Sequence, residues 1–155
     1  MPNWFYLILQ LFYDLGLAIW IGGALVLGAA VAPELFKALP KQQAGAIFGP
    51  ILGRFLRMRA FALLMIVISA GARFLIWERH AATFWLAGRW GAIVLLAWAL
   101  LGERSIQRKM RVFATNLGPE TEDSPVREIF RLLHIRAEGV MKASLIAALI
   151  ALFFS

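Results

Sequence analysis

Apolar residues gather in four long stretches, and polar residues gather between them. The stretches run from Trp4 to Ala32, Phe55 to Trp77, Phe84 to Leu101 and Arg136 to Phe154. Each is near or above the roughly 20 residues that a helix needs to cross a hydrocarbon core about 30 Å thick. With 61% hydrophobic residues and a mean hydropathy of +0.75, the chain has the composition of a membrane protein. The pattern predicts an all-α integral membrane four-helix bundle, with residues 1–155 forming one domain.

The connection between the third and fourth spans has a helical periodicity of its own. Basic side chains lie on one face, and apolar side chains recur at helical spacing on the other, at Ile106, Met110, Phe113 and Leu117. This pattern indicates a basic amphipathic helix, which is either the cytoplasmic end of the third span or a segment on the inner leaflet. We expect Gly118-Pro119 to end it.

The net charge of +7 is best explained by membrane topology. Twelve of the 16 Lys and Arg residues lie in the first and third connections and around the starts of the second and fourth spans. Cytoplasmic loops of membrane proteins carry such an excess of basic residues. We therefore expect a multi-pass protein of the bacterial cytoplasmic (inner) membrane with both termini outside (N-out/C-out). Nucleic acid is not an expected partner.

Small residues mark two faces that are suited to close helix packing. Gly16 and Gly23 share one face of the first span, while Gly45, Gly49 and Gly53 form a stripe at intervals of four residues. Small residues let helix backbones approach closely in lipid, where packing drives association. The stripes predict contacts within the bundle, a homo-oligomer or contacts with partner membrane subunits.

Asp14 is the first polar residue expected inside the membrane. An aspartate in the middle of a span costs about 2.5–3.5 kcal/mol, so it is usually paired or functional. Arg73 and Arg89 lie near the same end of the second and third spans, and one of them could reach Asp14. Two interpretations stay open: an interhelical salt bridge that fixes the bundle, and a site that binds a proton or a cation.

A second polar group is expected at the cytoplasmic side. His134, Glu138 and Lys142 share a face of the last helix with Arg131, and Glu34 of the first span lies at the same end. One interpretation is a solvated face on which Glu138 and Lys142 pair at the favourable i,i+4 spacing. The alternative is a cytoplasm-facing site in which His134 and the two carboxylates hold a divalent cation. Because Lys142 would repel a metal ion, no metal site is predicted.

Cofactor and enzyme signatures are weak. The chain has no cysteine, which excludes disulfides and thiolate metal sites. Haem needs an axial ligand such as histidine, but His80 and His134 fall on opposite sides of the membrane in this topology, and His80 is expected to be solvated. No motif of an NTPase, zinc protease or serine hydrolase is present. We expect no cofactor.

Four segments carry a resemblance to a known family. They are Trp20-Ile21-Gly22-Gly23, the stretch 32–40 (APELFKALP), the helix with Gly45, Gly49 and Gly53, and Ile129-Phe130-Arg131-Leu132-Leu133-His134. Their order and spacing resemble transmembrane protein 205-like proteins, a four-span domain of unknown molecular function. The family tends to place Ser and Asn one and two turns after that histidine, whereas Ala137, Glu138 and Met141 stand there in this chain. A eukaryotic relative is linked to tolerance of platinum drugs, so the resemblance implies a role in export or trafficking.

Three functional hypotheses follow. The first is a small transporter-like protein that handles a solute or a metal, with Asp14/Arg89 and His134/Glu138 as its polar sites. The second is a non-catalytic accessory subunit that packs against partner helices through its glycine stripes. The third is a redox subunit that binds haem or a pigment.

Overall fold

The computed structural model describes residues 3–78, 82–116 and 125–155, and nearly all of them are helical. The elements are α1 (Asn3–Leu25), η1 (Val26–Val31), α2 (Ala32–Ala38), α3 (Lys41–Ile76), α4 (Thr83–Asn116) and α5 (Pro125–Phe153). No strand occurs among these residues. The all-α prediction is therefore confirmed over this part of the chain.

The first helical rod is longer than the apolar pattern predicts. α1, η1 and α2 run on from one another as one stretch, Asn3–Ala38. η1 is a π-helical segment of six residues, which inserts a wider turn before Pro33 at the start of α2. Leu39 is extended, and α3 begins directly after Pro40. Proline is well suited to this position, because its missing N–H group would be unpaired at a helix start in any case.

α3 and α4 each join two segments that the sequence pattern treats separately. α3 is 36 residues long and contains Pro50, so the glycine stripe and the second apolar stretch belong to one helix. α4 continues for 34 residues to Asn116. The basic amphipathic segment is thus the end of the third long helix rather than a separate element. The expected stop at Gly118-Pro119 lies outside the described residues.

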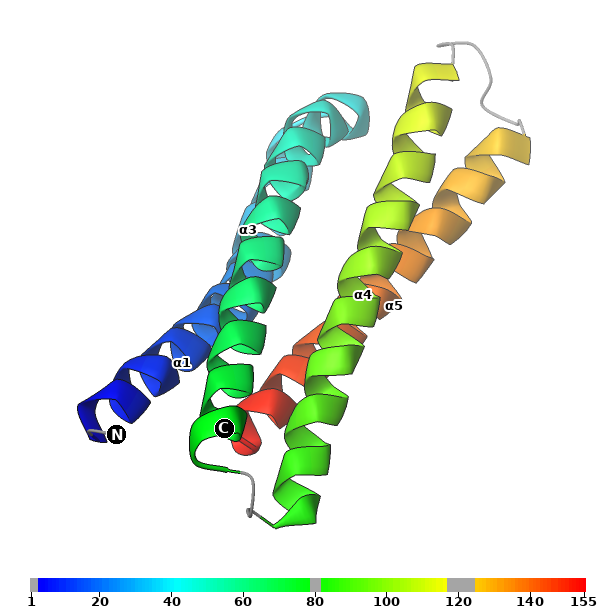
Figure 1. The fold of residues 1–155 in the computed structure, drawn as a ribbon. Coiled ribbons are helices and arrows are strands. Elements are labelled where there is room, and N and C mark those ends of the chain that lie inside the picture. Colours follow the sequence, from blue (N-terminus) through cyan, green and yellow to red (C-terminus); the bar gives the residue numbers. More distant parts are fainter. Residues whose placement is uncertain (1–2, 79–81, 117–124) are drawn as a thin grey trace.

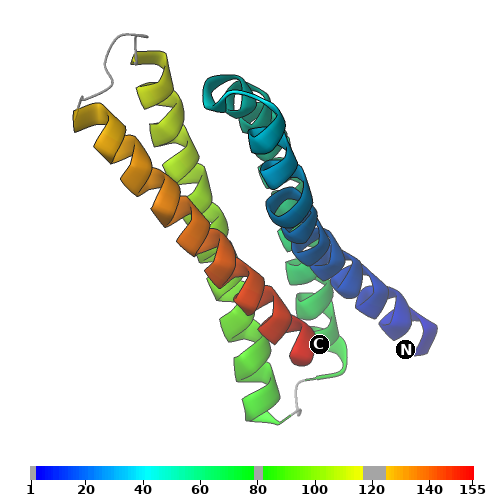
Figure 2. The same cartoon turned by 180° about the vertical axis from the view of Figure 1, so that it is seen from behind.

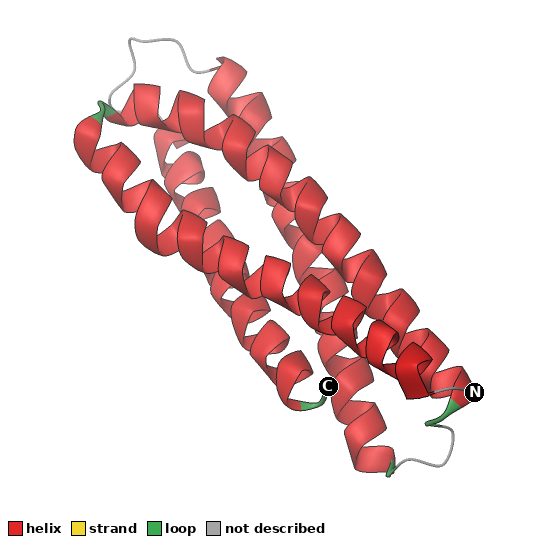
Figure 3. Cartoon of the chain, turned by 90° about the vertical axis from the view of Figure 1, so that its left-hand side faces the viewer, coloured by secondary structure: helices red, strands yellow, loops and turns green. Residues whose placement is uncertain are grey.

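The helices form two antiparallel pairs (Figures 1 and 2). α1 packs along α3, and α4 packs along α5. α5 crosses α4, and its C-terminal part lies against α1. Both chain termini and the connection from α3 to α4 lie at one end of the molecule, which we call the terminus end (Figure 3). The opposite end, where α2 meets α3, is called the basic end.

The distribution of side chains is that of a protein in lipid. Large apolar side chains are exposed along every long helix, among them Leu11, Phe61 and Trp98. Arg59, Arg73, Arg89 and Glu103 are buried instead. Three helical stretches are long and apolar enough to cross a membrane: Asn3–Ala38, Gln43–Ile76 and Thr83–Val112. α5 is not among them, because Arg136, Glu138 and Lys142 lie in the same stretch as its apolar residues. Lipid is the environment that these helices suit.

Candidate functional site

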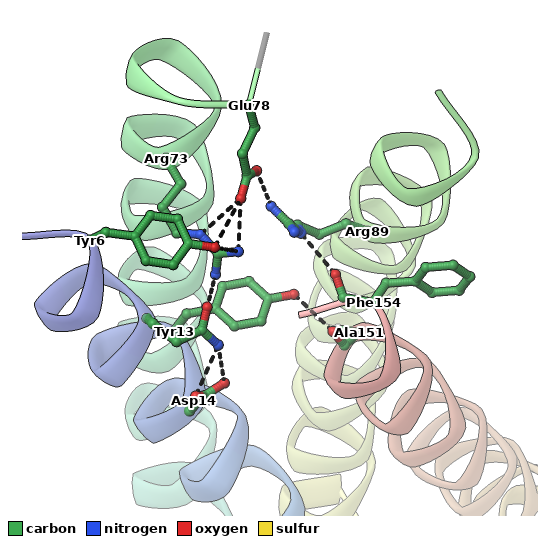
Figure 4. Close-up of polar contacts among 9 residues, drawn as sticks. Tyr6, Tyr13, Asp14, Arg73, Glu78, Arg89, Ala151 and Phe154 are labelled. Atoms are coloured by element: carbon green, nitrogen blue, oxygen red, sulfur yellow. Dashed lines mark hydrogen bonds and ion pairs between the residues drawn. The ribbon is translucent and has the colours of Figure 1, made fainter. Parts of the chain in front are cut away.

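Glu78 is the centre of a polar network at the terminus end (Figure 4). Its Oε1 accepts hydrogen bonds from Nη2 of Arg73 at 2.8 Å and from Nε of Arg73 at 3.1 Å. Its Oε2 pairs with Nη1 of Arg89 on α4. One carboxylate therefore joins two buried guanidinium groups that come from different helix pairs. We call Tyr6, Gln10, Asp14, Arg73, Glu78 and Arg89 the terminus-end cluster.

Asp14 is connected to the rest of this cluster through the side chain of Gln10. Nε2 of Gln10 donates to both carboxylate oxygens of Asp14 at 2.9 Å, and Oε1 of the same amide accepts a hydrogen bond from Arg73. The structure therefore does not pair Asp14 directly with Arg73 or Arg89. The carboxylate that both arginines contact is Glu78, which the sequence pattern places in a loop. Asp14 remains partly exposed and has no cation of its own.

The terminus-end cluster also holds the two helix pairs together. Nε of Arg89 donates to the carbonyl oxygen of Phe154 at 2.9 Å, and the hydroxyl of Tyr13 donates to the carbonyl oxygen of Ala151 at 3.0 Å. These carbonyls lie at the end of α5, where helix carbonyls have no partner within the helix. Figure 4 shows both contacts converging on the α5 end. The C-terminal turn is thereby fixed to both halves of the molecule.

A second polar group lies deeper, at a point where all four long helices meet. Arg59 of α3 pairs with Glu103 of α4 and donates from Nη2 to Oγ of Ser144 on α5 at 2.6 Å. Its guanidinium also lies 4.0 Å from the ring centre of Trp20 on α1. We call these four residues the central cluster. The side chain of Arg59 is only 1% exposed.

The central cluster lies near the middle of two candidate membrane-spanning stretches and is incompletely satisfied among the described residues. Arg59 stands midway along the stretch Gln43–Ile76, and Trp20 stands midway along Asn3–Ala38. Three buried polar atoms have no hydrogen-bond partner among the described residues: Trp20 Nε1, Arg59 Nε and Glu103 Oε1. At 1.5 Å per residue, Arg59 lies about 21 Å along α3 from Arg73. Buried polar atoms without partners are uncommon and point to a bound water, ion or ligand.

Sequence reasoning missed the central cluster. Arg59 counts there among the basic residues around the start of the second span, and Trp20 enters only through the segment Trp20-Ile21-Gly22-Gly23 of the family resemblance. The sequence pattern makes neither Glu103 nor Ser144 a candidate site residue. One signal was present, because Arg59 lies inside the apolar stretch that begins at Phe55 and Glu103 follows the stretch that ends at Leu101. An arginine and a glutamate at such depths in two spans require partners. Which partners they find depends on helix packing.

The residues expected to form a cytoplasmic-side site are spread over exposed surfaces. Glu34 is exposed on α2, and His134 is exposed on α5. Glu138 pairs with Lys142 at 2.6 Å, but the two side chains are 51% and 68% exposed. Within residues 3–78, 82–116 and 125–155, no group of His, Asp and Glu is arranged to hold a metal ion. His80 lies outside these ranges.

The glycines divide into two groups. A Cβ on Gly16 would lie 2.9 Å from the carbonyl oxygen of Ala62, and the ring of Phe55 occupies the space beside Gly23. These two glycines lie where α1 and α3 pack closely. A Cβ on Gly45 or Gly49 would meet nothing within 4 Å. The stripe of α3 therefore makes no close contact at these two positions.

Comparison with known proteins identifies a family. A family model described as a domain of unknown function (DUF4149) matches residues 15–113. This range contains Trp20, Arg59 and Glu103 of the central cluster, together with Arg73, Glu78 and Arg89. The match does not carry the transmembrane protein 205 name. Neither the curated proteins nor the solved structures give a match. Because the matched range covers more than half of the 155 residues, this chain belongs to the DUF4149 family of proteins with a domain of unknown function.

Proposed function

We propose that this protein is a small transporter-like membrane protein that handles a polar solute or an ion, with protons exchanging at Asp14. In this proposal α5 crosses the bilayer as a fourth span, beside the three stretches that are apolar enough to do so. The excess of basic residues at the basic end supports a topology with that end in the cytoplasm and both termini outside. The membrane is the inner membrane of a bacterium.

The observation that carries the proposal is the unpaired polarity of the central cluster. Over the residues that the structure describes, the donors Trp20 Nε1 and Arg59 Nε and the acceptor Glu103 Oε1 have no hydrogen-bond partner. A charged pair that served only to join helices would be expected to satisfy all its atoms, since each unsatisfied buried polar group costs about 1–3 kcal/mol. These donors and this acceptor could together bind a small polar ligand that has both a hydrogen-bond acceptor and a hydrogen-bond donor. Intramembrane ionisable groups mark substrate and ion pathways in many membrane proteins.

Asp14 suits the role of exchanging group better than the other interior carboxylates. Glu78 contacts two arginines and Glu103 contacts one. Each of these carboxylates is therefore part of an ion pair. Among the described residues, Asp14 accepts hydrogen bonds from the neutral amide of Gln10 and forms no ion pair. A proton that binds at Asp14 therefore breaks no ion pair between these helices.

Proton flux through the reconstituted protein tests the proposal. The protein is placed in liposomes that enclose a pH-sensitive dye, and a proton gradient is imposed with potassium and valinomycin controlling the potential. We expect flux above that of protein-free liposomes, and we expect Asp14→Asn to reduce it at least tenfold. Glu138→Gln, which changes an exposed carboxylate, serves as the matched control and should retain the flux. Equal flux in wild type and Asp14→Asn, or wild-type flux no greater than that of protein-free liposomes, would contradict the proposal.

The resemblance to transmembrane protein 205-like proteins agrees with this proposal. Export or trafficking of a solute needs a protein that offers polar groups inside the membrane. Within the described residues, the charged side chains that are buried lie in the terminus-end and central clusters, whereas His134 and Glu138 are exposed. We therefore assign the solute-handling role to the two clusters rather than to the polar face of α5.

A further inference from the structure

A hollow of about 530 Å³ lies at the basic end, formed by α3 and one residue of α4. Its floor contains the glycine stripe, Gly45, Gly49 and Gly53, where the absence of side chains leaves the space open. Arg54, Arg57 and Arg111 also line it. No acidic side chain of the described residues lines the hollow, and three arginines do, so these residues give it a positive charge.

The three guanidinium groups have no partner among the described residues. Arg54, Arg57 and Arg111 are all exposed, and none of them forms an ion pair or a hydrogen bond there. Nη2 of Arg111 lies 2.7 Å from the position that a Cβ on Gly53 would take. Arg111 therefore extends from α4 across the glycine face of α3, and the three cations surround one space.

A separate apolar groove lies further along the same helix, toward the terminus end. After Arg54 and Arg57, exposed apolar residues recur every three or four positions on the outward face of α3. They are Met58, Phe61, Leu64 and Ile68. Phe61, Leu64 and Ile68 line a groove of about 390 Å³ together with residues of α1. From Arg54 to Ile68 the helix rises about 21 Å, which exceeds the roughly 15 Å depth of one leaflet of hydrocarbon.

We propose that this face of α3 is a binding site for an anionic phospholipid, whose phosphate lies in the hollow and whose acyl chain lies in the groove. Guanidinium groups bind phosphate oxygens through charge-assisted hydrogen bonds, and basic pockets at the membrane surface bind anionic headgroups. The groove favours a lipid over free phosphate, because free phosphate has no apolar part to fill it. A second protein helix on the stripe is disfavoured, since it would bury three cations without partners.

Native mass spectrometry of the detergent-solubilised protein tests this site. Phosphatidylglycerol is titrated against phosphatidylcholine, and bound lipid is read from the mass of the complex. We expect one phosphatidylglycerol to bind saturably and at least tenfold more tightly than phosphatidylcholine. Arg111→Gln should weaken phosphatidylglycerol binding about fivefold, the effect of one surface cation. Gly49→Leu should weaken it by filling the hollow.

Matched control variants distinguish binding at this site from general electrostatic attraction of anionic lipid to the basic protein surface. Arg108→Gln removes an exposed cation of α4 that does not line the hollow, and Gly22→Leu adds a side chain in open space elsewhere. Both should bind like wild type. The proposal is overturned by an equal loss in Arg108→Gln, by complete displacement of the lipid with millimolar inorganic phosphate, or by a dimer that occupies the stripe and excludes lipid.

Discussion

Arg59 of α3 forms an ion pair with Glu103 of α4, 44 residues further along the chain, and both side chains are buried. The pair links the two helix pairs. Removing two charges from water is costly, and their mutual attraction offsets that cost only when further hydrogen bonds complete the site. Ser144 and Trp20 supply contacts to Arg59. The stability of this junction therefore depends on every helix.

We predict that Glu103→Gln destabilises the protein strongly. The substitution leaves Arg59 as a buried cation without a counter-charge, and breaking a buried pair in this way costs about 3–5 kcal/mol. Thermal unfolding in detergent, followed by circular dichroism, should show a marked fall in Tm. The double variant Arg59→Met/Glu103→Leu removes both charges and should recover most of the loss. A single variant as stable as wild type would show that the pair does not form.

We predict that Glu78→Gln destabilises the terminus end more than Asp14→Asn does. Glu78 neutralises two arginines, whereas Asp14 interacts with Gln10 alone. Loss of the Glu78 charge leaves like charges on Arg73 and Arg89 close together in a region of low dielectric. The same unfolding measurement should rank the variants as wild type, Asp14→Asn and Glu78→Gln in order of falling Tm. The reverse order of the two variants would mean that Asp14 is the principal counter-charge.

We predict that Gly16→Ala lowers stability by about 1–3 kcal/mol, the usual cost of overpacking. The added methyl group would press on backbone at Ala62, where α1 and α3 are closest, so relief requires the helices to move apart. Gly22→Ala is the matched control, because its Cβ meets nothing within 4 Å. Since alanine favours helix over glycine by about 1 kcal/mol, the control should be neutral or slightly stabilising. Equal effects at the two positions would contradict close packing at Gly16.

Much of the fold follows from sequence patterns that act locally. The apolar stretches identify the helices, Pro40 marks the start of α3, and the periodicity of residues 106–117 identifies the extension of α4 as far as Asn116. The π-helical segment after Leu25 has no comparable local signal. The continuity of the glycine stripe with the second span is not predicted either, because the apolar stretch begins only at Phe55, after the stripe.

The candidate site follows from sequence only in part. Periodicity gives the face of a helix on which a residue lies, but it does not give the helix that packs there. Arg73, Arg89 and Asp14 are recognised as interior residues from the sequence. Glu78, the common partner of the two arginines, is not, because it follows the last apolar residue of the second apolar stretch. In the sequence, Arg59 looks like a basic residue near a loop. Only the packing of α4 and α5 against α3 shows that Glu103 and Ser144 contact it.

We predict that both termini are accessible from outside the cell and that residue 131 is not. The chain has no cysteine, so single cysteines can be introduced at Ser155 and Arg131 without removing native thiols. A membrane-impermeant maleimide applied to intact cells should label Ser155→Cys at once. It should label Arg131→Cys only after the membrane is permeabilised. Labelling of both positions in intact cells would place the two ends of α5 on the same side and contradict a fourth span.

The accessibility of the Trp20 indole N–H tests most directly whether the central cluster holds a polar ligand or water. Indole signals of ¹⁵N-labelled protein are followed by NMR after transfer to deuterated buffer, and Trp20→Phe identifies the signal. Although Trp20 is fully buried, we expect its N–H to exchange within minutes, because a solvent or solute molecule reaches Nε1. Protection lasting for hours would show a dry, closed junction and would contradict a polar site at the centre of the protein.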